Sequence, residues 1–188
     1  MDPRHRLLEN ALELFASRGY DAVGVQEIVE ASDVTKPTLY HHFENKHGLL
    51  EALFEEFITP FFERLEKLCV YQGDLPKLLT DIVAAHLQYA RQQPNFYRLY
   101  LALYFAPPQS PSFNVAAQRH DRQFLMMEHV FELASRDHGN MRGRHQRYAF
   151  TFLGMINSYC AALINGLVKP RPNMEHDIVH QFCHGIYS

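Results

Sequence analysis

Hydrophobic positions recur every three or four residues along almost the whole chain, and runs of β-branched residues are scarce. This spacing places apolar side chains on one face of a helix, whereas a half-buried strand would need strict alternation. The segment from Leu7 to Phe15 is typical of the pattern. Gly19 is expected to end this first helix, because glycine readily adopts the left-handed conformation found at helix ends. The pattern predicts an all-α protein.

Proline and capping residues set the expected limits of the following helices. A long helix is predicted from Lys46 to about Cys69, and Pro60 should kink or split it because the proline ring removes a backbone donor. Asp74 is placed to cap the next helix. Pro94 should open another.

The segment Val25 to Phe43, "VQEIVEASDVTKPTLYHHF", has the spacing of a helix-turn-helix, with a tight turn at residues 32–35. Asp33 stands where the turn needs a positive φ, which Asp tolerates better than most residues. Thr35 can cap the helix that follows, and Pro37 fits its first turn. The start of such a helix offers free N–H groups and a positive dipole end, both suited to a phosphate.

The longer segment from Gly19 to Leu50, "GYDAVGVQEIVEASDVTKPTLYHHFENKHGLL", resembles the DNA-binding region of the TetR family of transcriptional regulators. The resemblance covers roughly residues 4–55. It implies an N-terminal three-helix helix-turn-helix DNA-binding domain at residues 1–47 and a helical ligand-binding and dimerisation domain at residues 48–188. It also implies a homodimer, a repressor, that binds a palindromic double-stranded operator and releases it when a small molecule enters the C-terminal domain.

The same resemblance assigns roles to the residues of the third predicted helix. Leu39 and Phe43 should face the core, and His42 should support the helix from inside. Lys46 matches the family's phosphate-binding lysine. The face that enters the major groove would carry Lys36, Pro37, Thr38, Tyr40 and His41.

The chain as a whole is slightly acidic, so any binding to nucleic acid must come from a local surface and not from an overall positive charge. The formal net charge is −3 and the sequence pI is about 6.4. Residues 1–47 contain five Lys or Arg side chains against eight Asp or Glu side chains. We therefore expect modest non-specific affinity for DNA and a shallow dependence of affinity on salt.

Two predicted helices near the C-terminus, Tyr148 to Val168 and Asn173 to Tyr187, are expected to form a four-helix dimer interface. Small side chains on one stripe let a partner helix approach closely. The alternatives are packing inside a monomer or a membrane span, for which the first helix is long enough but carries several polar residues. The residues assigned to the interface are Gly154, Ser158, Ala161, Asn165, Ile178 and Phe182.

An aromatic segment, "NFYRLYLALYF" at residues 95–105, predicts a ligand cavity, since tyrosines and methionines offer wide apolar surface with a few hydrogen bonds. The alternative is that these side chains only fill the core. The expected effector is small and apolar or aromatic. The residues assigned to its binding are Phe57, Phe61, His86, Tyr89, Tyr100, Tyr104, Phe124 and Met127.

Three histidines on the last predicted helix, His176, His180 and His184, share one face at spacings of four residues. Two histidines so spaced can share a zinc ion. No thiolate or carboxylate lies on the same stripe, so exposed or interfacial histidines are favoured over a metal or pH-responsive site, and we assign no metal and no cofactor. The competing function is therefore a metal- or pH-sensing helical binding protein that does not use DNA.

Other features exclude further classes of protein. No set of nucleophile, base and orienting group stands out and there is no glycine-rich phosphate loop, so an enzyme is not expected. The three cysteines are an odd number without close spacing, which favours reduced thiols. The N-terminal sequence lacks the features of a signal or transit peptide, which predicts a cytoplasmic location.

Overall fold

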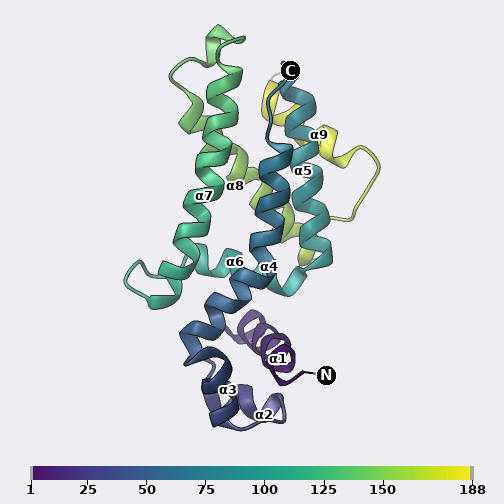
Figure 1. The fold of residues 1–188 in the computed structure, drawn as a ribbon. Helices are drawn as coiled ribbons and strands as arrows, with labels where there is room; N and C mark the ends of the chain where they lie inside the picture. Colours follow the sequence, from purple (N-terminus) through teal and green to yellow (C-terminus); the bar gives the residue numbers. More distant parts are fainter. Residues whose placement is uncertain (1, 187–188) are drawn as a thin grey trace. The chain divides into compact units, whose positions relative to one another are not determined.

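The computed structural model describes residues 2–186, and these form nine α-helices, one short 3-10 helix and no strand (Figure 1). The all-α prediction is confirmed. The predicted end of the last helix at Tyr187 lies outside the described residues. The helices are α1 (Pro3–Arg18), α2 (Val25–Ala31), α3 (Lys36–Phe43), α4 (Lys46–Leu68), α5 (Leu75–Gln92), α6 (Pro94–Tyr104), α7 (Pro111–Ala134), η1 (Gly139–Met141), α8 (His145–Ile164) and α9 (Met174–His184).

The chain divides into two compact units. The first unit comprises the described residues up to Pro60 together with Asn95–His120, and the second comprises Phe61–Pro94 with the described residues from Asp121 onward. Helices α4 and α7 each contribute to both units. The predicted division after residue 47 falls inside the first unit, and as a division of function it stays a prediction.

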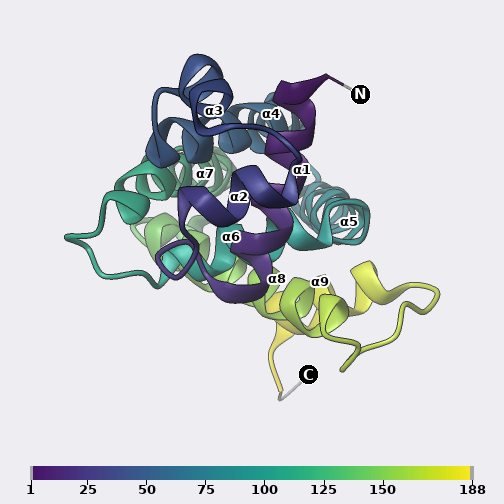
Figure 2. The same ribbon diagram turned by 90° about the horizontal axis from the view of Figure 1, so that it is seen from below.

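In the first unit, α1, α2 and α3 contact one another in every pairing, and Figure 2 views them from a second direction. Asp2 caps α1 by accepting a hydrogen bond from the Arg4 N–H. Gly19 ends this helix at φ 85°, as predicted. The apolar stripe of α1, including Leu7, Leu8 and Phe15, is almost fully buried.

Helix α4 is continuous through Pro60, so of the two effects predicted for this residue, a kink or a split, the split does not occur. Proline inside a helix costs about 3 kcal/mol through its missing N–H and its ring. Ile58, Phe61 and Phe62 on either side of it are at most 5% exposed. Burial of each such side chain contributes about 2 kcal/mol, so local packing offsets the loss.

In the second unit, α5 contacts both α8 and α9. Asp74 caps α5 as predicted, accepting from the Lys77 N–H at 3.0 Å. Helix α8 ends at Ile164, four residues before the predicted Val168, because Gly166 turns the chain at φ 71°. Among the described helices none is long and apolar enough to cross a membrane, which removes the alternative of a membrane span at α8.

Candidate nucleic-acid interface

Helix α3 separates its residues into a buried and an exposed face, as the sequence predicts. Leu39 and Phe43 are at most 5% exposed, and they hold the helix against its neighbours. Tyr40 is 46% exposed although it is large and aromatic. The other predicted DNA-binding residues of α3 follow the same division: Lys36, Pro37 and His41 are exposed, and Thr38 is half-buried.

The turn between α2 and α3 fixes the direction in which α3 leaves the core. Asp33 adopts φ 50°, which confirms the predicted left-handed position. The Val34 N–H donates to the Val29 carbonyl at 3.0 Å, closing the turn. Arg6 of α1 lies 3.8 Å from the Asp33 carboxylate, so α1 partly neutralises the acid that the turn exposes.

The first turn of α3 is not capped in the expected way. Thr35 is the N-cap residue, but its hydroxyl pairs with the Thr38 hydroxyl at 3.0 Å and makes no capping bond to a backbone N–H. The predicted side-chain cap is therefore wrong. Because Thr38 competes for the Thr35 hydroxyl, the helix start keeps its positive end without a side-chain cap.

Lys46 is held by the loop that precedes α2. Its Nζ donates to the carbonyl oxygens of Tyr20 at 3.0 Å and Val23 at 2.9 Å and lies 4.2 Å from the centre of the Tyr20 ring. Desolvation by burial lowers the pKa of Lys46, and Asp21 opposes that shift. An ammonium group has three N–H donors, and Lys46 uses two of them to stabilise the α1–α2 loop.

The junction of α3 and α4 brings two backbones into close contact at Gly48. A Cβ atom at this position would lie 2.1 Å from the Phe43 carbonyl oxygen. Glu44 leaves α3 at φ 63°, and the Asn45 side chain accepts the Gly48 N–H at 2.9 Å. Only glycine fits here, so this residue sets the angle between the exposed helix α3 and α4.

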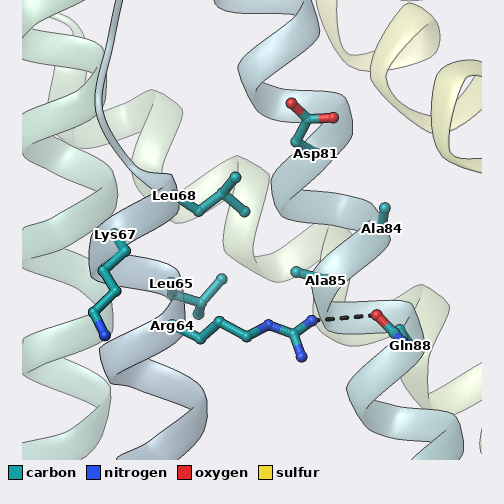
Figure 3. Close-up of a pocket in the computed structure, with 8 residues that line it drawn as sticks. All are labelled: Arg64, Leu65, Lys67, Leu68, Asp81, Ala84, Ala85 and Gln88. Carbon is teal, nitrogen blue, oxygen red and sulfur yellow. Dashed lines mark hydrogen bonds between the residues drawn. The ribbon is translucent and has the colours of Figure 1, made fainter.

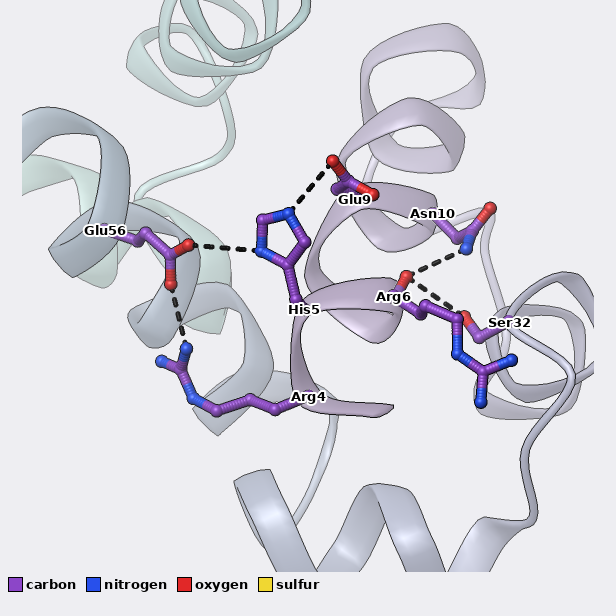
Figure 4. Close-up of polar contacts among 7 residues, drawn as sticks. All are labelled: Arg4, His5, Arg6, Glu9, Asn10, Ser32 and Glu56. Atoms are coloured by element: carbon purple, nitrogen blue, oxygen red, sulfur yellow. Dashed lines mark hydrogen bonds and ion pairs between the residues drawn. The ribbon is translucent and has the colours of Figure 1, made fainter. Parts of the chain in front are cut away.

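Polar contacts tie α1 to α4 within the first unit (Figure 4). Glu56 of α4 accepts from Arg4 at 3.0 Å and lies 3.8 Å from His5 Nδ1. His5 also lies 3.1 Å from Glu9 on its own helix. Arg4 is thus paired with an acid within the chain.

The predicted effector residues fall in both units. In the first unit, Phe57 stacks on Phe96 at 5.3 Å, and Tyr100 is 1% exposed. Tyr104 is 41% exposed. In the second unit, the Phe61 ring stacks on Tyr89 at 4.2 Å and meets His86 edge-on at 5.1 Å. Met127 is fully buried and Phe124 is half-buried against Phe150.

His86 carries a buried polar contact between α5 and α7. It is fully buried; its Nδ1 lies 2.8 Å from the Ile82 carbonyl oxygen and its Nε2 lies 2.8 Å from the Gln123 side-chain nitrogen. Since a carbonyl only accepts, Nδ1 carries the proton and Nε2 accepts from Gln123. Burial lowers the pKa of His86 to about 4, against a smaller opposing effect of the Ile82 bond.

His120 is a buried polar residue that the sequence reasoning missed. It is 8% exposed, stacks on Tyr100 at 4.2 Å and meets the Tyr104 ring at 4.5 Å. Burial lowers its pKa to about 4, opposed by a hydrogen bond to the Tyr100 backbone. Among the described residues its Nε2 has no hydrogen-bond partner. His120 lies 20 residues after Tyr100 and 16 after Tyr104, so no short spacing in the sequence indicates that the three rings meet.

A groove of about 470 Å³ runs between α4 and α5 in the second unit (Figure 3). Ala84 and Ala85 leave room along α5, and Leu65 and Leu68 supply apolar surface from α4. Arg64 reaches across to the Gln88 side-chain oxygen at 3.2 Å. The predicted effector residues do not line this groove.

The predicted dimer residues divide into an exposed and a buried set. Gly154, Ser158 and Asn165 are exposed on α8, and Ala161 is half-buried. Ile178 is 2% exposed, and the half-buried Phe182 packs against Phe152 at 5.1 Å. Both side chains contact the core of their own chain, and the assignment of Ile178 and Phe182 to an interface stays a prediction.

The histidine stripe of α9 lies on the surface. His176, His180 and His184 are all exposed. Within residues 2–186 no group of three or more His, Cys, Asp or Glu side chains is arranged to hold a metal ion. The stripe therefore offers no closed site with three or four protein ligands.

Comparison with known proteins places the N-terminal region in one family. Residues 7–53 match the model of bacterial regulatory proteins of the tetR family. The transcriptional activator FasR of Mycolicibacterium smegmatis is 32% identical over 137 residues, which are 72% of this chain and 60% of FasR. The transcriptional repressor ComR of Escherichia coli is 35% identical over 83 residues, which are 44% of this chain and 40% of ComR. The chain thus spans less than two thirds of these relatives.

Solved structures share the fold over nearly the full chain. A putative fatty acid metabolism regulator of Clostridium perfringens matches with a TM-score of 0.81 and 16% identity, covering 97% of this chain and 99% of that one. FadR of Bacillus subtilis, solved in complex with stearoyl-CoA, matches with a TM-score of 0.79, 17% identity and the same coverage. With its helix-turn-helix geometry and these similarities, the chain belongs to the TetR family of bacterial regulatory proteins.

Proposed function

We propose that this protein is a transcriptional repressor that binds a palindromic operator as a homodimer and releases it on binding a small apolar or aromatic effector. The observation that carries the proposal is the exposed face of α3. A large aromatic side chain, Tyr40, stands 46% exposed beside Lys36, Pro37 and His41 at an uncapped helix start. Such a surface fits a phosphate and base edges better than water.

DNA binding is tested with a fragment from upstream of the protein's own gene, by fluorescence anisotropy. Tyr40→Ala and Lys36→Ala should each weaken binding by about tenfold, because each removes a contact worth 1–3 kcal/mol. Lys67→Ala is the matched control, since Lys67 is also exposed but lies in the second unit. Equal affinity of wild type and Tyr40→Ala would remove α3 from the interface. Failure of the wild type to bind the fragment or genomic DNA would favour the metal- or pH-sensing alternative.

The effector class is inferred from the buried aromatic side chains. In the first unit, the stacked rings of Tyr100 and His120 lie beside Tyr104, which is aromatic and exposed. The unpartnered Nε2 of His120 is a buried acceptor, and leaving such an atom without a donor costs about 1–3 kcal/mol. An apolar or aromatic molecule that carries one hydroxyl or N–H group would satisfy it.

Effector binding is tested by release of labelled operator DNA. Phenols and their methyl ethers form matched pairs that differ in one donor, and the phenols should release DNA more strongly. His120→Phe should abolish that difference while leaving DNA affinity intact. Stearoyl-CoA, bound by the Bacillus subtilis relative, is the competing class; release by stearoyl-CoA alone would overturn the proposed effector.

Both activation and repression of transcription occur among the relatives, because FasR is named an activator and ComR a repressor. Repression is proposed because an operator-bound dimer that overlaps a promoter blocks polymerase without further contacts. In vitro transcription from the bound promoter should fall when the protein is added and recover with the effector.

A further inference from the structure

The exposed histidine stripe of α9 borders a groove that the proposed function does not use. This groove, about 470 Å³ in volume, lies between α9 and the first turns of α5. We propose that the last turn of α9 binds a divalent transition-metal ion of the Ni²⁺ or Cu²⁺ type through His180 and His184. This inference is independent of DNA binding.

The spacing of the rings singles out one pair of histidines. The ring centres of His180 and His184 are 4.5 Å apart, whereas those of His176 and His180 are 6.0 Å apart. With a metal–nitrogen bond of about 2.1 Å, each ring centre lies about 3.3 Å from the metal, and two ligands about 90° apart have ring centres about 4.7 Å apart. The first pair therefore fits adjacent ligand positions with little rearrangement.

The charges around the last turn favour a cation. The final carbonyl groups of a helix carry partial negative charge, so a cation is stabilised there. Across the groove lie Asp74, the N-cap residue of α5, and Asp81 of α5, together with one cation, Lys77, whose Nζ lies 2.6 Å from Asp81. In the part of the chain that the structure describes, neither His180 nor His184 forms an ion pair.

The other candidate ligands of α9 are engaged or unsuited. His176 lies 3.6 Å from Asp177, which is itself paired with Arg171. Cys183 is a thiol and lies about 100° around the helix axis from His184. With two protein ligands, the remaining coordination positions hold water. Open positions and imidazole ligands suit Ni²⁺ and Cu²⁺, which do not require a closed tetrahedral site.

The experiment titrates Ni²⁺ into the tag-free full chain by isothermal calorimetry. His180→Gln and His184→Gln should each weaken binding on the order of tenfold or more, because a pair reduced to one ligand loses its chelate. His176→Gln is the control on the same stripe, and His129→Gln is an exposed control on α7. Both controls should bind within about twofold of wild type, and circular dichroism should show unchanged helix content.

Two results would overturn the proposal. One is loss of binding in His176→Gln as large as that in His184→Gln, because the ring spacing would then not select the pair. The other is unchanged affinity in both His180→Gln and His184→Gln, which would place the ion elsewhere. Affinity should also fall as the pH is lowered, because protons compete with the metal for imidazole nitrogen.

Discussion

At the scale of single residues, the buried histidines are the groups whose chemistry depends most on the fold. His86 is fully enclosed and stays neutral, with Nδ1–H donating to Ile82 and Nε2 accepting from Gln123. A charged imidazole could not keep the second bond, because both of its nitrogens would be donors. Protonation of His86 therefore opposes folding.

Stability should fall as the pH drops from about 6.5 to about 4. The folded pKa of His86 is lowered to about 4, below its ordinary value of 6.5. In this window the unfolded chain takes up a proton that the folded chain excludes, so the free energy of unfolding falls by up to roughly 3 kcal/mol. Above pH 6.5 both states are neutral and His86 adds no pH dependence. Urea unfolding at a series of pH values measures the slope.

His86→Phe is the variant that isolates this group. It removes the titration and also the bond from Gln123 to His86 Nε2, so it should be less stable than wild type at pH 7 and less sensitive to acid. His120 keeps part of the slope, because its pKa is also lowered to about 4. A slope identical to wild type in His86→Phe would contradict the assignment.

At the scale of elements, the junction of α3 and α4 is the most constrained point of the first unit. The close contact at Gly48 involves backbone atoms, which cannot move aside as a flexible side chain can. Lys46, two residues earlier, bonds to the loop before α2. The exposed face of α3 is thus oriented by backbone geometry as well as by core packing.

Gly48→Ala should destabilise the protein by about 2 kcal/mol or more, since a clash with a carbonyl forces the helix junction open. The matched control is Gly154→Ala, also a glycine inside a helix, where an added Cβ meets nothing within 4 Å. That control should be neutral or stabilising by about 0.5–1 kcal/mol, because alanine favours helix. Urea unfolding compares the two, and equal stability of both variants would contradict the close contact.

Elements set by local residues could be predicted from the sequence, and those set by distant contacts could not. The bounds of α2 and the left-handed Asp33 follow from neighbouring residues and are confirmed. The partners of Lys46 lie more than 20 residues away, so its two carbonyl bonds could not be predicted from neighbouring residues. The 2% exposure of Ile178 within its own chain could not be predicted either, because helical spacing shows that a residue is apolar without showing which surface covers it.

At the scale of the whole molecule, the proposed dimer rests on the exposed stripe of α8. Gly154→Leu should weaken the dimer by at least about tenfold, because a large side chain prevents close approach of two helices. Within the single chain Gly154 is exposed, and an added Cβ atom meets nothing within 4 Å. Sedimentation velocity over a range of concentrations measures the change, and an unchanged dimer would exclude Gly154 from the interface.

The salt dependence of DNA binding should be shallow. Arg4 and Arg18 are paired with Glu56 and Glu27 inside the first unit. If only Lys36 and Lys46 of each subunit contact phosphates, a dimer gives a slope of about −4 in log affinity against log salt. Anisotropy titrations from low to high salt measure it. A slope of about −8 or steeper would mean that further cations reach the DNA.

The hydrogen bond between Gln123 and His86 also reduces the number of ways in which the helices of the second unit can pack with similar energy. Helices covered with leucine and phenylalanine can pack in several neighbouring registers of similar energy. Shifting α7 along α5 by one turn would keep most apolar contacts but break the buried bond between Gln123 and His86 Nε2. We expect this hydrogen bond to select one of these registers. The aromatic side chains of α5 and α7 would then have a single arrangement when an effector binds.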